Sequence, residues 1–170
     1  YAHAANGGIK IDKTAHTGVE GLYACGEATG GMHGADRIGG LSSANGIVFG
    51  RIAGASAALA AQKEPEIALK ADIALPRYGI STTDAERLTH GLKHTMSTYC
   101  MINRTETGLS EALQQLESLQ DKAMALSKPH ADDSEIAALA RLQSQIRLAQ
   151  EMVKAMRKRT ESLGSHYRAD

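Results

Sequence analysis

Aromatic residues are scarce in this sequence, which has one Phe, five Tyr and no Trp among 170 residues. Proteins that bind single-stranded nucleic acid usually stack the bases on aromatic rings, so this scarcity argues against that class. The charge balance agrees, because 19 basic and 19 acidic residues leave a formal net charge of +0. Without a field of one sign to attract a polyanion, we expect no nucleic-acid partner.

Cysteine and long apolar runs are scarce as well. Cys25 and Cys100 stand in separate apolar contexts without metal-ligand spacing, so we expect two reduced, buried thiols of an intracellular protein and no metal site. No run of about 18 apolar residues is evident, which predicts no transmembrane segment. The sequence opens on Tyr1 without a start Met or basic leader, so we expect a fragment of a longer protein.

Glycine is distributed unevenly, and its distribution predicts an α+β fold in two parts. Residues 1–62 hold most of the glycines in a pattern of short strands, turns and one helix. Residues 63–78 contain Pro65 and Pro76 and are expected to be a linker. Residues 79–170 are poor in glycine and have helical periodicity, which predicts a separate helical domain.

The first part shows two candidate strands and one candidate helix. Gly8–Asp12 alternates as a strand does, Gly21–Cys25 suits a more buried strand, and a polar stretch between them makes a hairpin plausible. A glycine-rich loop follows over residues 26–40. Ser42 or Ser43 can then cap a helix that runs to about Gln62.

One face of this predicted helix carries only small residues. Gly46, Gly50, Gly54 and Ala58 recur at steps of four. Each glycine inside a helix costs roughly 1 kcal/mol relative to alanine, so three aligned glycines indicate close packing on a neighbouring helix or a cofactor.

The second part predicts three amphipathic helices in an antiparallel bundle. Each helix has one apolar stripe. The stripes are Leu88, Leu92, Met96 and Tyr99; Leu109, Leu113, Leu116, Leu119, Ala123 and Leu126; and Ile136, Leu139, Leu142, Ile146, Ala149, Val153 and Met156. We expect a break at Lys128–His130, a cap at Asp133 or Ser134 for the third helix, and its end near Gly164.

The glycine-rich loop is the place where the sequence indicates chemistry. Six glycines and a carboxylate between a strand and a helix start suit a ligand that lies close to the backbone, with helix N–H groups facing its negative charge. The alternative is a long glycine turn without a ligand. The sequence contains neither a GxGxxG dinucleotide motif nor a P-loop.

Five segments in order resemble the flavoprotein family of succinate dehydrogenase, fumarate reductase and L-aspartate oxidase. His3 to Asp12 resembles "HxxMGGIxxD", and Leu92, Met96, Cys100 and Arg104 recur at the family's spacing. The other three segments resemble longer patterns. GLYACGEATGGMHGADR at 21–37 resembles "GLYAxGExTGGxHGANR", IGGLSSANGIVFGRIAG at 38–54 resembles "LGGNSLxxxxVFGRxAG", and RTESLGSHYRAD at 159–170 resembles "RTESRGAHxRxD".

The resemblance implies that residues 1–62 are the C-terminal part of an FAD-binding domain and that residues 79–170 are the family's helical domain. It implies that His3 and Arg37 bind a carboxylate of a dicarboxylate substrate. Glu27 would bond the ribityl chain of FAD, with His33 either supporting the loop or touching a ligand. The remaining cofactor positions are the helix start and the glycines before it, namely Gly39, Gly40, Leu41, Ser42 and Ser43.

Four positions depart from the family pattern and bear on the substrate more than on the flavin. Asp36 and Leu41 replace Asn, Asn6 replaces Met, and Leu163 replaces Arg. A negative charge at Asp36 either orients the Arg37 guanidinium or weakens its hold on an anion. His166 and Arg168 match the end motif, and we interpret them as packing or interdomain residues.

By this resemblance, the parent protein moves a hydride between FAD and a dicarboxylate and passes electrons to a carrier such as an iron–sulfur subunit. It would be cytoplasmic or bound to a membrane through a partner. The N-terminal FAD unit and the capping domain with the proton donor would lie outside the sequence, so no catalytic residue is expected here. The alternatives are an L-aspartate oxidase, and an inactive chain whose helices serve as a subunit-interaction module.

Overall fold

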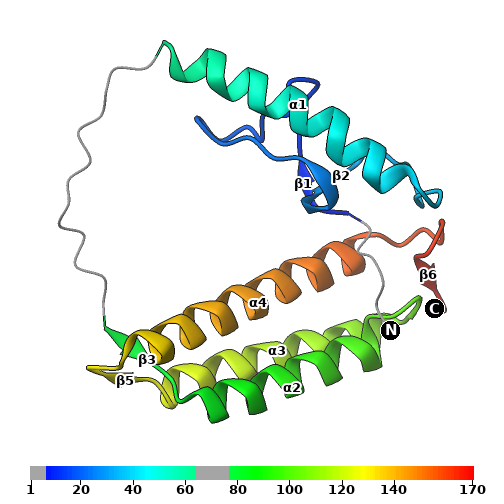
Figure 1. Cartoon of the computed structure of the whole chain (residues 1–170). Coiled ribbons are helices and arrows are strands. Elements are labelled where there is room, and N and C mark those ends of the chain that lie inside the picture. The colour runs from blue at the N-terminus through cyan, green and yellow to red at the C-terminus, as the bar shows by residue number, and fades with distance from the viewer. Residues whose placement is uncertain (1–6, 64–76) are drawn as a thin grey trace. The chain divides into compact units, whose positions relative to one another are not determined.

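The computed structural model describes residues 7–63 and 77–170. The chain divides into two compact units, Tyr1–Ala71 and Asp72–Asp170, which we call the N-terminal unit and the C-terminal unit (Figure 1). The predicted positions His3 and Asn6 lie outside the described residues, as does most of the predicted linker. Helices dominate the described structure and the strands are short, which agrees with a mixed fold.

The N-terminal unit has a small parallel strand pair. Strand β1, Ile9–Lys10, pairs with β2, Thr29–Gly30, and a short 3-10 helix η1, Gly26–Ala28, precedes β2. Glycine is required where the two segments meet, because a Cβ atom at Gly8 would lie 2.5 Å from the Ala28 carbonyl oxygen. The strand that pairs with β1 is therefore inside the glycine-rich loop.

This arrangement corrects the predicted hairpin. Residues 21–25 form no strand, and among residues 7–63 the antiparallel pairing is limited to a bridge between His16 and Tyr23. The Asp12 carboxylate accepts hydrogen bonds from the backbone N–H groups of Thr14 and His16, which closes a tight turn and ends the extended chain early. Cys25 is exposed rather than buried, whereas Cys100 is buried as predicted.

Helix α1, Leu41–Ala61, begins after Gly40, whose φ of 88° places it in the left-handed region. Ser42 and Ser43 therefore lie in the first turn instead of capping it. The expected close packing of the small-residue face is absent within the described part of the chain. Gly46 and Gly54 have no atom within 4 Å of an added Cβ, and Gly50 meets only the Cys25 sulfur at 3.9 Å.

By length and composition alone, α1 could cross a membrane, since an 18-residue window of it reaches a mean hydropathy of 1.2. The helix is not an unbroken apolar run, since it contains Ser42, Ser43, Asn45 and Arg51. Apolar helices of this length also occur in the interior of water-soluble folds. Asn45 in the second turn of α1 and Arg51 at its middle argue against a membrane span, because a hydrocarbon core does not solvate such side chains.

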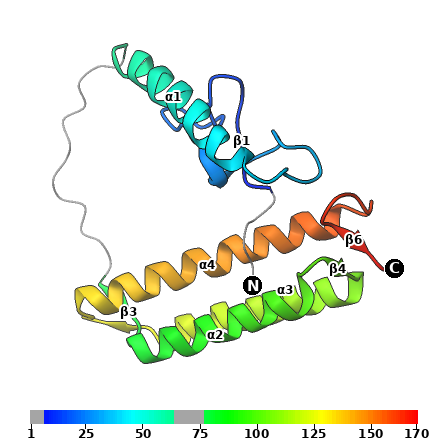
Figure 2. The same cartoon turned by 45° about the vertical axis from the view of Figure 1, so that its right-hand side comes forward.

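The C-terminal unit consists mainly of helices α2, Thr82–Tyr99, α3, Glu106–Ala125, and α4, Asp133–Lys158. Successive helices run in opposite directions and lie side by side (Figures 1 and 2). The predicted apolar stripes line their shared core, except for Ile136, which is outside the core cluster, and Leu126, which is 40% exposed. The fully buried larger side chains of the core are Ile80, Leu109, Leu116, Leu142, Ile146 and Val153.

The ends of α4 differ from the prediction. The N-cap is Asp132, whose carboxylate accepts from the Glu135 N–H at 2.9 Å while the Glu135 carboxylate accepts from the Asp132 N–H at 3.3 Å. This reciprocal pair forms a capping box, which neither Asp133 nor Ser134 could complete with Glu135. The helix ends at Lys158, and Gly164 instead forms a later turn with a φ of 62°.

Two short strand pairs close the ends of the helices. At the predicted break, β5, Lys128–Pro129, pairs antiparallel with β3, Tyr78–Gly79, which confirms the break. At the other end, β4, Asn103–Arg104, pairs in parallel with β6, Tyr167–Arg168. His166 is buried beside β6 and so packs within this unit, which is one of the two roles interpreted from the sequence.

Candidate functional site

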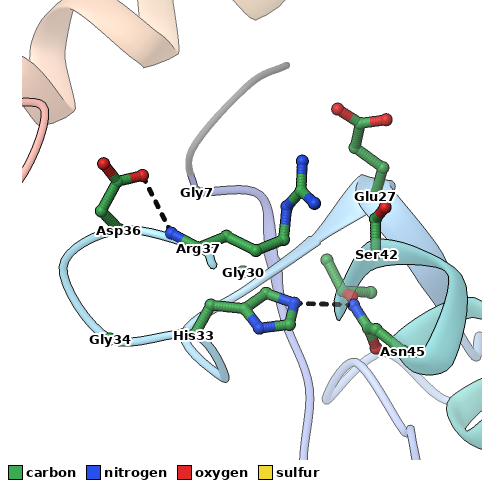
Figure 3. A pocket seen from close by; sticks show the side chains of 11 residues that line it. Gly7, Glu27, Gly30, His33, Gly34, Asp36, Arg37, Ser42 and Asn45 are labelled. Carbon is green, nitrogen blue, oxygen red and sulfur yellow. Dashed lines mark hydrogen bonds between the residues drawn. The ribbon is translucent and has the colours of Figure 1, made fainter. Parts of the chain in front are cut away.

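A hollow in the N-terminal unit brings together the glycine-rich loop, β2 and the first turns of α1. It encloses about 460 Å³ of empty space, part of which is open to solvent. Figure 3 shows the side chains that surround it. The lining residues are Gly7, Glu27, Thr29, Gly30, Gly31, His33, Gly34, Asp36, Arg37, Ser42 and Asn45.

Arg37 contributes a cation to this hollow. Its guanidinium extends toward the side where Glu27 and Ser42 lie, and Asp36 points the opposite way (Figure 3). The Asp36 carboxylate accepts a hydrogen bond from the Arg37 backbone N–H at 2.9 Å. Within the described part of the chain, the guanidinium makes no hydrogen bond or ion pair. Asp36 therefore orients the backbone and leaves the charge of the Arg37 guanidinium available to an anion.

His33 and Asn45 join the loop to α1. The Asn45 Nδ2 atom lies 3.2 Å from the Nε2 atom of His33 (Figure 3). Asn45 is 8% exposed, and its Oδ1 atom has no hydrogen-bond partner among the described residues. Burying an amide oxygen without a partner costs free energy.

The start of α1 presents backbone N–H groups to the hollow's edge. No side chain caps this helix, and no acidic residue lies in its first turn. The Leu41 N–H donates to the Ile38 carbonyl at 3.3 Å, so the next N–H groups, those of Ser42 and Ser43, remain to receive a negatively charged atom. An added Cβ at Gly39 or Gly40 would meet nothing within 4 Å, so both glycines face open space.

The structure thus brings some of the predicted site residues together and not others. Glu27, Arg37 and Ser42 line one hollow, while Gly39, Gly40, Leu41 and Ser43 lie beside it at the helix start. His3 lies outside the described residues, so its distance to Arg37 is not defined.

Sequence reasoning missed Asn45 as a lining residue. Its position four residues after Leu41 was an available signal, because residues i and i+4 share one helix face. Among residues 7–63 and 77–170, no group of three or more His, Cys, Asp or Glu is placed to hold a metal ion.

Comparison with known proteins gives matches over both units. Residues 1–43 match a family model described as an FAD-binding domain, and residues 89–170 match one described as the fumarate reductase flavoprotein C-terminus. An uncharacterized FAD-dependent oxidoreductase of Methanocaldococcus jannaschii is 33% identical over 99% of this chain and 32% of its own length. One chain of the fumarate reductase (CoM/CoB) of Methanothermobacter marburgensis is also 33% identical, over the same shares.

Solved structures extend the likeness to the fold. The FrdA chain of Escherichia coli quinol fumarate reductase superposes with a TM-score of 0.79 at 27% identity, over 96% of this chain and 30% of FrdA. The Sdh1 chain of Mycobacterium smegmatis gives a TM-score of 0.78 at 31% identity, over 96% and 29%. The chain therefore spans about a third of the length of these relatives.

Proposed function

Because this chain belongs to the FAD-dependent fumarate reductase and succinate dehydrogenase flavoprotein family, we propose that it supplies the carboxylate-binding wall of a dicarboxylate oxidoreductase. In this proposal the whole protein transfers a hydride between FAD and a dicarboxylate. The observation that carries the proposal is the Arg37 guanidinium, which lines the hollow without an ion pair among the described residues.

The residues at the start of α1 fit the flavin. Gly39 and Gly40 face open space, so a flat ring system can approach the backbone closely. The uncapped N–H groups of Ser42 and Ser43, together with the helix dipole, stabilise negative charge at the ring edge. Leu41 lies in the same first turn of α1. Glu27 on the hollow's rim can accept hydrogen bonds from ribityl hydroxyls. FAD, when bound, supplies the hydride chemistry.

Arg37 is proposed to hold a carboxylate of the substrate. Its planar guanidinium can donate two parallel hydrogen bonds to a carboxylate, which fixes the orientation of the anion as well as its position. His3 is proposed as a second donor to the same substrate. These residues bind and orient, while the proton donor for the reacting carbon would come from the part of the protein outside this chain.

The C-terminal unit is proposed to be an antiparallel three-helix domain that follows the FAD-binding domain. Its apolar core is built mainly from side chains of α2, α3 and α4, which suits a structural or partner-binding role. We further propose that an iron–sulfur protein or a quinone accepts the electrons. Copurification of an iron–sulfur protein with the full-length protein tests the first of these acceptors.

The full-length protein with its bound FAD should be assayed with fumarate, succinate and L-aspartate. We expect activity with fumarate or succinate, and an Arg37→Gln variant should lose roughly 10- to 100-fold in dicarboxylate affinity, the range for a hydrogen bond to a charged group. Arg147→Gln on the exposed face of α4 is the matched control and should bind as the parent does. Activity with L-aspartate alone, or unchanged affinity in Arg37→Gln, would contradict the proposal.

A further inference from the structure

We propose that Asn45 is a positioning residue that holds His33, and through His33 the loop that carries Arg37. The proposal rests on the proposed function of Arg37 and assigns a role to a buried helix residue for which neither the motifs nor the comparisons provide one. The Asn45 amide would act on the substrate indirectly, by fixing where the guanidinium lies.

The first argument is mechanical. Loop residues Gly31, Gly34 and Gly40 have φ values of 92°, 66° and 88°. These conformations are cheap for glycine, and a loop rich in such residues has more backbone freedom than a helix or a strand. The hydrogen bond between His33 and Asn45 joins this loop to a residue in the second turn of α1. Arg37 lies four residues beyond that attachment, so the attachment restricts the positions that the guanidinium can reach.

The second argument comes from the burial of Asn45. A surface amide exchanges partners with water at little cost, but Asn45 is 8% exposed and cannot do so. A buried amide that makes a hydrogen bond stabilises one arrangement of the groups around it. Its partner His33 lines the hollow together with Arg37, so the arrangement that Asn45 stabilises is that of the hollow's wall.

The third argument concerns which atoms of the amide are used. With Nδ2 facing His33, the imidazole accepts the hydrogen bond at Nε2, and Oδ1 remains without a partner among the described residues. Turning the amide by 180° exchanges its oxygen and nitrogen, two atoms of nearly the same size and shape. Oδ1 would then accept a hydrogen bond from Nε2–H of His33. Either orientation gives Asn45 a hydrogen bond to His33, so the attachment of the loop does not depend on which one is present.

The proposed attachment of His33 by Asn45 predicts different results for two substitutions of similar size. Asn45→Leu removes the hydrogen bond, so the loop loses its attachment. Asn45→Asp places a carboxylate acceptor beside His33, and a protonated Nε2 of His33 can donate to it. The apolar variant should weaken dicarboxylate binding, whereas the acidic variant should retain it.

The test uses the full-length flavoprotein and measures the dissociation constants of fumarate and succinate from changes in flavin absorbance, together with KM, kcat and FAD content. For Asn45→Leu we expect the dissociation constants and KM to rise about tenfold, which is the effect on binding of losing one hydrogen bond. FAD content should be unchanged. For Asn45→Asp the dissociation constants should stay within about threefold of those of the parent, because a hydrogen bond to His33 is kept.

A double-mutant cycle tests whether Asn45 acts through His33. If it does, His33→Leu combined with Asn45→Leu should bind no more weakly than either single variant. Gln62→Leu, an exposed amide at the far end of α1, is the matched control and should change nothing. Additive losses in the cycle, unchanged binding in Asn45→Leu, or a loss in Asn45→Asp equal to that in Asn45→Leu would each overturn the proposal. If the parent protein itself bound no dicarboxylate, the proposed function would fail instead.

Discussion

The guanidinium of Arg104 donates a hydrogen bond to Nδ1 of His166 and thereby joins two residues 62 positions apart. The other ring nitrogen, Nε2, lies 2.9 Å from the Arg159 carbonyl oxygen and donates to it. Only a neutral imidazole with its proton on Nε2 satisfies both contacts. Burial lowers the pKa of His166, and the nearby charges of Arg104, Arg159 and Arg168 lower it further.

We predict that this contact makes stability pH-dependent in the weakly acidic range. Because the folded-state pKa of His166 lies below its ordinary value, the unfolded chain binds the proton more readily. Stability is therefore complete above the ordinary histidine pKa of about 6.5 and falls as the pH drops from there toward the lowered value. A His166→Gln variant, whose amide can accept from Arg104 and donate to Arg159, should show a flatter dependence. Urea unfolding of both proteins between about pH 7 and pH 5 measures the difference, and parallel curves would contradict it.

We predict that Asp132→Ala destabilises the start of α4. The substitution leaves the Glu135 N–H without its cap and removes a carboxylate from the positive end of the helix dipole. Hydrogen exchange should accelerate in the first turn of α4 and stay unchanged in its centre. Asp133→Ala, one residue further, is the control because its side chain is not the cap, and an equal effect there would argue against the capping role.

We predict that Gly79→Ala is strongly unfavourable although its backbone is not in the left-handed region. An added Cβ would lie 2.5 Å from the Ala131 Cβ and 2.6 Å from the Glu135 carbonyl carbon, so backbone must move. Overpacking of this kind costs about 1–3 kcal/mol. Gly91→Ala is the matched control, since its Cβ would meet a movable Leu119 methyl at 3.2 Å and would gain helix propensity. The denaturant midpoint should fall for the first variant and stay or rise for the second.

We predict that Leu116→Ala removes a large part of the stability of the C-terminal unit. Leu116 is 0% exposed in the core between the helices, and a cavity at such a site costs about 2–5 kcal/mol. Leu148→Ala deletes the same atoms from a side chain that is 63% exposed. Its effect should stay within about 0.5 kcal/mol. Thermal and denaturant unfolding of the two variants give the comparison, and similar losses would contradict the assigned core.

The C-terminal helices were predictable because their signal is local and repeated. Leu109, Leu116 and Ala123 recur at the helical period, and all three are buried in the core. The N-cap of α4 was predictable as well, because Asp132 and Glu135 stand at the capping-box spacing in the sequence, whereas Asp133 and Ser134 do not. Residue type alone had left Asp133 and Ser134 as the candidates.

The N-terminal unit was less predictable because its elements are too short for periodicity to identify. Thr29–Gly30 became a strand only because Gly8 and Gly30 lack side chains and allow the two backbones to meet. We expected Cys25 to be buried because its sequence neighbours are apolar, but the turns around it leave it exposed within this unit. Turn geometry of this kind depends on contacts between distant residues, which composition does not record.

By itself, the sequence determined the helical periods, the break at Lys128–His130 and the order of the motifs that indicate a flavoprotein family, since each of these depends on neighbouring residues. The tertiary structure alone decided that the Arg37 guanidinium turns away from Asp36 and that Asn45 lies against His33. Adjacent residues can point in opposite directions and residues 12 apart can meet, because a side chain's surroundings are set by how the backbone folds around it.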